Sequence, residues 1–200
     1  MMQRLLALGL CLPLALRAQA SDSRIDRLSS PLRDSVALVM DSAREAGLPT
    51  GPLLQKALEG TAKQASVPSV MRAVRALSDA LRVSRAALGS PSSPDELSAA
   101  AVALRMGARP SDLTKLRLAR PVRSLVVPLA VLSDLVARGV PADTATHVVI
   151  ALAGSADDQD YMAFRRSVDR DIDLGVPPGS SAFGQLNVSA RALLNPAKKP

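Results

Sequence analysis

Hydrophobic residues recur every three to four positions along most of the chain, which is the spacing of amphipathic α-helices. This period predicts helices at about residues 32–43, 54–62, 70–88, 94–104, 112–119, 122–138, 148–152, 158–172 and 180–186. No stretch shows sustained alternation with period two, so we predict no strands. The predicted fold class is all-α, a helical bundle or short solenoid of about eight to nine helices.

The joints between these helices share one arrangement, in which a glycine and an apolar residue come before a proline. It occurs at Gly47-Leu48-Pro49, Gly107-Ala108-Arg109-Pro110, Gly139-Val140-Pro141 and Gly175-Val176-Pro177. Glycine adopts a left-handed conformation without a Cβ clash, the apolar residue packs on the last turn, and proline cannot continue the helix. We expect a polar side chain to cap each following helix. The expected caps are Thr50, Ser111, Asp143 and Ser180.

Other helix ends carry their own signals. Ser93 and Glu96 have the spacing of a capping box, and Ser155 and Asp158 indicate the start of the helix at about 158. Pro128 falls inside the helix predicted at 122–138, so we expect a kink there.

The chain shows signs of internal duplication. Gly47 and Gly107 occupy equivalent joints, and the triplet Leu-Ser-Asp at 77–79 recurs at 132–134. We expect one α-helical domain with two units of three to four helices that bury their apolar faces on each other. A single irregular bundle with similar joints is the alternative. The predicted boundaries are a flexible lead-in at 21–30, a domain at 31–194 with units at about 31–90 and 91–154 and a partial third unit at 155–194, and a disordered basic tail at 195–200.

Residues 1–20 have the features of a secretory signal peptide. A basic start is followed by an apolar run over residues 5–16, and Ala18-x-Ala20 is a small-x-small cleavage pattern. The run is shorter than the about 20 residues that a transmembrane helix needs. We therefore expect cleavage at about Ala20-Ser21, a periplasmic or extracellular protein, and no transmembrane span in the mature chain.

Composition and charge narrow the possible partners. The chain has 25 Lys and Arg residues against 18 Asp and Glu, a net charge of +7, and its one cysteine, Cys11, lies in the predicted signal peptide. Aromatic residues make up 2% of the chain, which disfavours binding by stacking on bases or sugars. We expect a protein or an anionic envelope polymer as partner, and no nucleic acid because the protein is exported.

The most distinctive charged string is Lys56, Glu59 and Lys63, whose spacing places the three charges along one helix face. Gly60 within the same helix costs about 1 kcal/mol relative to alanine. That cost is tolerated where another helix crosses closely. The string therefore has either a structural or a binding role.

Two further groups are rich in basic residues. Arg72, Arg75, Arg82 and Arg85 lie on the helix predicted at 70–88, and Lys115, Arg117, Arg120 and Arg123 surround the joint after 112–119. Such groups either bind phosphate or anionic polymers or form a solvated face. The candidate binding residues are Lys56, Glu59, Lys63, Arg72, Arg75, Lys115 and Arg120.

Catalytic and metal-binding patterns are not evident. His147 is the single histidine, and no G-x-S-x-G turn marks a serine nucleophile. The three aspartates at 169, 171 and 173 depart from a calcium loop, because the glycine comes one position late and no glutamate closes it. We expect no catalytic set, no metal and no cofactor. An enzyme that uses Glu59 with Lys56 and arginines is the alternative, and a structural subunit of an envelope assembly is another.

Two segments resemble a known family. They are Gly47-Leu48-Pro49 with Pro52-Leu53-Leu54-x-Lys56-Ala57-Leu58-Glu59-Gly60-x-x-Lys63, and Val127-Pro128-Leu129 with Leu132-x-Asp134-Leu135-Val136-Ala137-Arg138-Gly139-Val140-Pro141. Over about residues 35–175 the chain resembles a family of uncharacterised secreted bacterial α-helical proteins with no assigned function. The resemblance implies export and a helical fold and transfers no site. We expect an exported, non-catalytic module that binds a protein, a peptide or an anionic envelope component.

Overall fold

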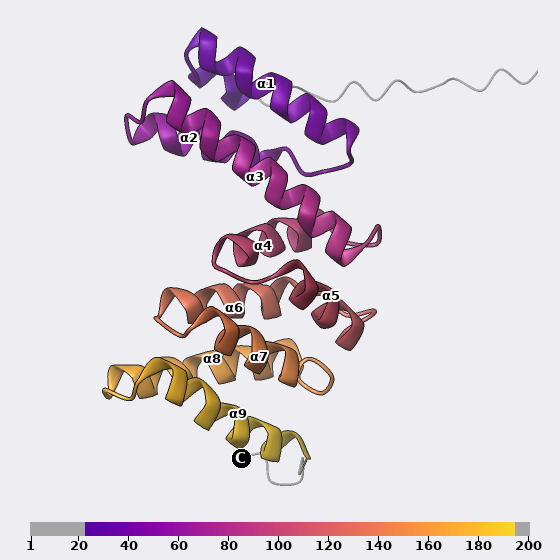
Figure 1. The fold of residues 1–200 in the computed structure, drawn as a ribbon, viewed down its shortest axis with the longest axis vertical. Coiled ribbons are helices and arrows are strands. Elements are labelled where there is room, and N and C mark those ends of the chain that lie inside the picture. The colour runs from indigo at the N-terminus through magenta and orange to yellow at the C-terminus, as the bar shows by residue number, and fades with distance from the viewer. Residues whose placement is uncertain (1–22, 195–200) are drawn as a thin grey trace, which may run out of the picture.

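The helices are stacked one after another along the long axis of the molecule (Figure 1). The computed structural model describes residues 23–194, where a 3-10 helix is followed by nine α-helices. They are η1 (Ser23–Arg27), α1 (Ser30–Glu45), α2 (Gly51–Ala62), α3 (Val67–Leu88), α4 (Pro94–Arg105), α5 (Pro110–Ala119), α6 (Val126–Ala137), α7 (Ala142–Leu152), α8 (Asp158–Asp173) and α9 (Pro178–Leu194). Every regular element of this range is helical, which confirms the predicted all-α fold of about nine helices.

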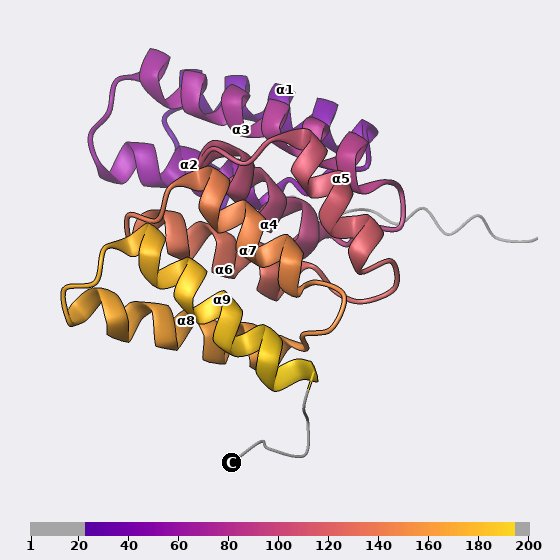
Figure 2. The same cartoon turned by 60° about the horizontal axis from the view of Figure 1, so that its bottom comes forward.

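Two layers of helices run through the molecule. One layer contains α4, α6 and α8, which contact one another in that order, and the other contains α3, α5, α7 and α9. At the N-terminal end, α1 and α2 both pack on α3, so α1 extends the second layer. We call α1, α3, α5, α7 and α9 the odd layer. Figure 2 shows α7 and α9 of this layer in front of α6 and α8.

A helix hairpin repeats through the C-terminal part of the stack. α4, α6 and α8 begin at Pro94, Val126 and Asp158, and each start lies 32 residues after the one before. α4 and α6 have 12 residues each, whereas α8 has 16, which is about one turn more. The structural repeat is therefore one hairpin, about half as long as the units predicted at 31–90 and 91–154. The predicted partial third unit is the complete hairpin of α8 and α9.

Two hydrophobic cores meet at α3 and α4. The N-terminal core contains buried side chains of α1, α2 and α3, together with Leu97 and Ala101 of α4. The C-terminal core takes Leu88 from the end of α3, Ala100 and Ala103 from α4, and buried side chains onward to α9. Because adjacent positions of α4 serve different cores, this helix joins the two halves.

The four glycine joints have the predicted backbone. Gly47, Gly107, Gly139 and Gly175 have φ values of 66°, 105°, 92° and 91°. In each joint the residue after the glycine donates its N–H to a carbonyl of the preceding helix, as Leu48 does to Ala43 at 2.9 Å. Leu48, Ala108 and Val140 are buried as expected, whereas Val176 is 37% exposed.

A fifth joint has the same form without a glycine. Gln64 follows α2 with φ of 55°, and the N–H of Ala65 donates to the carbonyl of Gly60 at 3.0 Å. A left-handed conformation costs a residue with a Cβ roughly 1 kcal/mol. This joint between α2 and α3 is therefore more strained than the other four.

The helices after the glycine joints begin earlier than predicted. α5 and α9 start at Pro110 and Pro178, and α7 starts directly after Pro141, because proline is favoured at the beginning of a helix. Thr50 occupies the N-cap of α2, but its side chain forms no capping bond. α9 is also longer than the short helix predicted there. The predicted caps that lie inside their helices are Ser111, Asp143 and Ser180.

Reciprocal capping boxes start α4 and α8. The predicted box at α4 is confirmed, because Glu96 accepts the N–H of Ser93 and Ser93 accepts the N–H of Glu96. The predicted cap at Ser155 is wrong. Asp157 occupies the N-cap of α8 and forms its box with Asp160.

One further expectation was wrong, and the predicted lead-in contains a short helix. Pro128 does not kink a helix, because α6 begins at Val126 and the proline lies in its first turn, where an N–H has no intrahelical partner. The described part of the predicted lead-in contains regular structure. It forms η1, and Leu28 after it is 4% exposed and belongs to the N-terminal core.

The predicted signal peptide at 1–20 and the predicted tail at 195–200 lie outside the described residues. None of the helices within residues 23–194 has both the length and the hydropathy that crossing a bilayer requires.

Candidate functional site

Lys56, Glu59 and Lys63 lie together on one face of α2, as their spacing predicts. Lys56 Nζ donates to Glu59 Oε2 at 2.5 Å, and Lys63 Nζ donates to Glu59 Oε1 at 2.6 Å. The hydrogen bonds from these two lysines lower the pKa of Glu59 to about 2. Glu59 is therefore ionised near neutral pH with both oxygens bound, which makes it a poor general base.

Gly60 marks the close approach of α2 and α3. A Cβ on Gly60 would lie 2.7 Å from Cγ2 of Val70, which is inside van der Waals contact. Glycine is needed here because α3 crosses α2 at this point. The predicted explanation for a glycine within this helix is thus confirmed.

The α1–α3 groove is a depression of about 320 Å³ between two helices of the odd layer. Arg75 forms no ion pair within the described part of the chain, and Arg82 donates to Ser42 Oγ at 2.9 Å. Leu38 is 73% exposed at the groove. The lining residues are Ser35, Leu38, Val39, Ser42, Arg75, Ser78, Asp79 and Arg82. The groove therefore combines two guanidinium groups, one carboxylate and exposed apolar surface.

The α5–α7 pocket, of about 330 Å³, lies between two other helices of the odd layer. Arg109 donates to Oδ2 of Asp112 from its backbone N–H at 3.2 Å and from Nε at 3.0 Å. Lys115 Nζ lies 3.6 Å from Oδ1 of the same carboxylate. Burial alone would raise the pKa of Asp112, but the bonds from Arg109 and the charge of Lys115 hold it below its usual range. Asp112 is thus a buried, ionised carboxylate.

The α7 side of this pocket carries two further polar side chains. Thr146 is 4% exposed, and its hydroxyl forms no hydrogen bond with any described residue. His147 packs its ring against Phe183 of α9, with 5.7 Å between the ring centroids. Ile150 and Ala151 add apolar surface. The pocket therefore brings the single histidine next to charged and hydroxyl groups.

The carboxylate of Glu96, 7% exposed, connects three helices. It accepts the backbone N–H of Ser93 at the start of α4 and the N–H of Leu125 at the start of α6, both at 2.9 Å. Arg117 of α5 donates to it at 2.7 Å. Burial would raise the pKa of Glu96, but these three donors lower it below its usual value. Glu96 therefore holds two hairpins together.

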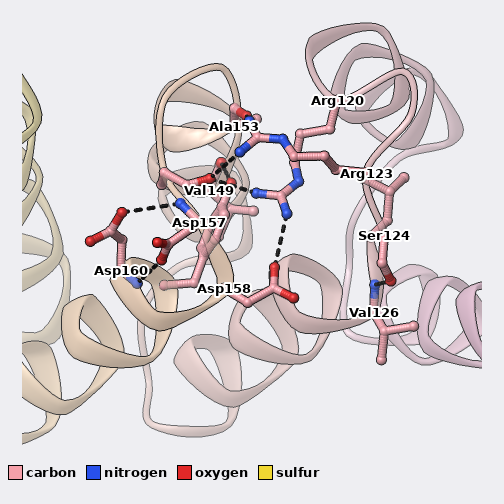
Figure 3. A network of polar contacts seen from close by, with 12 residues as sticks. Arg120, Arg123, Ser124, Val126, Val149, Ala153, Asp157, Asp158 and Asp160 are labelled. Atoms are coloured by element: carbon pink, nitrogen blue, oxygen red, sulfur yellow. Dashed lines mark hydrogen bonds and ion pairs between the residues drawn. The ribbon is translucent and has the colours of Figure 1, made fainter.

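Arg120, a predicted binding residue, lies inside the array with 2% of its surface exposed. It donates to the carbonyl of Ala156 at 2.7 Å and to Asp158 Oδ1 at 2.8 Å (Figure 3). Its guanidinium carbon also lies 5.4 Å from the centre of the Tyr161 ring. The Tyr161 hydroxyl donates to the carbonyl of Val149 at 2.7 Å, and burial raises its pKa. Arg120 therefore joins the start of α8 to the connection between α5 and α6, and its guanidinium is already bonded within the protein.

The other two arginines of this group also bond within the protein. Arg123 donates to three carbonyls at the end of α7, those of Ala153, Gly154 and Ala156. Arg117 donates to the carbonyls of Arg120 and Arg123 as well as to Glu96. The predicted basic cluster is thus divided. Its three arginines bond to the protein itself, and two of them, Arg120 and Arg123, also line a depression that includes Asp157 and Asp158. Lys115 lines the α5–α7 pocket.

The three aspartates within residues 169–173 face other helices. Arg138 bonds to the first and third of them, and Asp171 accepts from Ser181 at 3.1 Å and from Gln185 at 2.8 Å. No three His, Cys, Asp or Glu side chains within the part of the chain that the structure describes are grouped to hold a metal ion.

The chain matches no family model, no curated protein and no solved structure. Functional inference therefore depends on the grooves themselves. Among the predicted residues, Arg75 lies in the α1–α3 groove, Lys115 lies in the α5–α7 pocket, and Arg72 lines neither. The sequence did not single out Leu38 and Thr146. Each lines a depression whose other wall is a helix distant in sequence, and no short-range pattern identifies such a pairing.

Proposed function

We propose that the protein is an exported helical-repeat module that binds an acidic segment of a protein or peptide in the α1–α3 groove. The observation that carries this proposal is that the groove combines arginine charge without an acidic partner and exposed apolar surface. Arg75 has no ion pair in the described chain, Arg82 bonds to a hydroxyl, and Leu38 is 73% exposed beside them.

The groove offers the complements of an acidic, partly apolar segment. Arginine presents several N–H donors in a plane and binds carboxylates in pairs. Arg75 and Arg82 exceed the single acid of the groove, Asp79, so its net charge is positive. Leu38 and Val39 provide apolar surface that a partner side chain can bury. Stacked helix layers commonly present such extended binding surfaces.

The alternative functions have less support. An enzyme based on Glu59 would need a free carboxylate in a cavity, whereas Glu59 is bound by Lys56 and Lys63 and lines neither groove. A structural subunit would need a concentrated apolar patch. The exposed large apolar side chains instead occur along the chain from α1 to α9, including Leu38 of α1, Val122 between α5 and α6, and Val188 of α9.

Export is tested separately from binding. Expression in a bacterium with a general secretory pathway, followed by fractionation and mass spectrometry, should give an envelope or extracellular protein that begins at about Ser21. A full-length chain that stays in the cytoplasm would contradict this part of the proposal.

The binding test uses a fluorescent peptide rich in glutamate and leucine, with a lysine–leucine peptide as control, and measures anisotropy. Arg75→Glu should weaken binding of the acidic peptide by about tenfold or more, because it replaces an attraction by a repulsion. The matched control is Arg72→Glu, the same change on the same helix outside the groove. It should weaken binding much less.

Two outcomes would contradict the groove as the binding site. An equal loss in Arg75→Glu and Arg72→Glu would indicate general attraction to a basic protein. Displacement of the peptide by polyphosphate, with equal affinity in the wild type and in Arg75→Glu, would indicate a polyanion site elsewhere.

A further inference from the structure

In the α5–α7 pocket both carboxylates are paired, whereas one basic group keeps hydrogen-bond donors without an acceptor. Both acids are engaged by Arg109, since Asp112 accepts two of its N–H groups and Asp143 lies 3.5 Å from its guanidinium. Lys115 has three N–H donors, and its nearest carboxylate oxygen is 3.6 Å away, beyond a hydrogen bond. The ammonium group therefore keeps unused donors.

Two further groups on the α7 wall add to this surplus. The buried hydroxyl of Thr146 has no partner among the described residues, which is costly for a polar group removed from water. The imidazole of His147 contacts the Phe183 ring, and no hydrogen bond joins it to any residue between 23 and 194. These donors thus collect in one pocket, in which both carboxylates, Asp112 and Asp143, are already paired with Arg109.

We infer that the α5–α7 pocket binds an oxyanion, the carboxylate or phosphate group of a small ligand. Lys115 supplies the charge, Thr146 supplies a hydrogen bond from the buried wall, and His147 lines the opening. A group with two or more acceptor oxygens satisfies several of these donors at once.

The remaining surface limits what the oxyanion is attached to. Ile150 and Ala151 line the pocket beside the polar groups, so a short apolar part of the ligand can be buried there. The volume of about 330 Å³ is at the lower end of the range for small-molecule sites, roughly 300–1,000 Å³. The pocket therefore fits a small organic acid or a single side chain rather than a folded segment.

This site is independent of the α1–α3 groove, because the two depressions share no lining residue. A failure of the acidic peptide to bind would leave the pocket proposal standing. A failure of the pocket would likewise leave the groove proposal standing.

His147 provides a direct test, because the protein has a single histidine. The proton on Cε1 of its imidazole gives one NMR signal, which can be followed during titration of the full chain with sodium acetate and, separately, with sodium phosphate. Ionic strength is held constant with chloride, and pH is fixed. We expect saturable shifts of this signal with one or both anions, and the preferred anion identifies the ligand group.

Two variants assign the shift to the pocket. Lys115→Gln should weaken binding by about tenfold or more, because a charge-assisted bond is lost. Lys56→Gln, the same change on α2, is the matched control and should have no effect. Thr146→Val should weaken binding while the unfolding temperature stays the same or rises, since it removes a buried hydroxyl that has no partner. A structural role alone would not produce that combination.

Three results would overturn the proposal. They are a His147 signal that shifts with neither anion, a shift that does not saturate, and a saturable shift with the same affinity in Lys115→Gln as in the wild type.

Discussion

The charged groups on α2 and between α4 and α8 contain the same kinds of side chain in opposite surroundings. On α2, Lys56 and Lys63 pair with Glu59 within one helix and remain partly in water, with the Glu59 side chain 39% exposed. Between α4 and α8, Glu96 and Arg120 are buried, and each bridges separate helices.

This difference decides what each group can contribute. Exposed pairs stabilise a protein by about 0–1 kcal/mol, whereas removing one partner of a buried pair costs about 3–5 kcal/mol. Charge in a sequence therefore does not by itself locate a binding site. A basic residue is available to a partner only where the fold leaves its donors unused, as it does at Arg75 and Lys115.

The strongest test of this contrast is Arg120→Ala. It removes the donor to the Asp158 carboxylate and one of the two donors to the Ala156 carbonyl, and it opens space beside Tyr161. We expect a loss of about 2–3 kcal/mol in the free energy of unfolding, measured with urea, mainly from lost hydrogen bonds and packing, because Asp158 is 48% exposed and water can replace its partner. Arg72→Ala, which changes an exposed arginine, should lose less than about 0.5 kcal/mol. Equal losses would remove the distinction between buried and exposed charge.

Glu96→Gln tests the other buried group. One amide nitrogen must then face a donor where the carboxylate accepted from Ser93, Arg117 and Leu125. We expect a loss of about 2 kcal/mol at neutral pH, because hydrogen bonds to a charged acceptor are replaced. Urea unfolding measures it, and an unchanged midpoint would contradict the role of Glu96.

The same variant has a pH signature. The folded-state pKa of Glu96 lies below the ordinary value of 4.5, so its stabilisation is fully present above that pH and is lost as pH falls through the folded-state pKa. The difference in stability between wild type and Glu96→Gln should therefore shrink as the pH falls below about 4.5. A difference that stays constant into acid would show that the ionised carboxylate is not responsible.

Gly60→Ala tests whether close packing on α3, and not the charged group of α2, holds α2 in place. Alanine improves helix propensity by about 1 kcal/mol, but its Cβ would collide with Val70, and overpacking costs about 1–3 kcal/mol. We expect a net loss of about 1 kcal/mol. Val70→Ala in the same chain should recover part of it, a coupling that a double-mutant cycle measures. A more stable Gly60→Ala protein would mean that α2 and α3 move apart enough to accept the added methyl group, and would contradict the role of close packing.

The smallest effect belongs to Glu59→Gln. Although Lys56 and Lys63 lower the pKa of Glu59 to about 2, the group is accessible to solvent and its interactions are screened. We expect no measurable change in the thermal unfolding midpoint, at low or at high salt. A loss of stability comparable to that of Glu96→Gln would show that the charged group on α2 stabilises the fold as the buried groups do.

These two regions also show how far sequence reasoning reaches. The glycine joints, the capping box at Ser93 and the close approach at Gly60 all depend on residues within a few positions of one another, and each was predicted. The Arg120–Asp158 pair spans 38 residues and the Glu96–Leu125 bond spans 29, so only the packing of hairpins reveals them. The same holds for the two grooves, whose walls come from helices that are distant in sequence.

α4 contributes Leu97 and Ala101 to one core and Ala100 and Ala103 to the other. In a linear array with nearest-neighbour coupling, such a shared helix sets the cooperativity of unfolding. Opening either half uncovers one side of α4 and weakens the other half. We therefore expect the slowest-exchanging amides to lie in α3 and α4, and unfolding to begin at the ends of the stack. α4 therefore both separates the two hydrophobic cores and couples their unfolding.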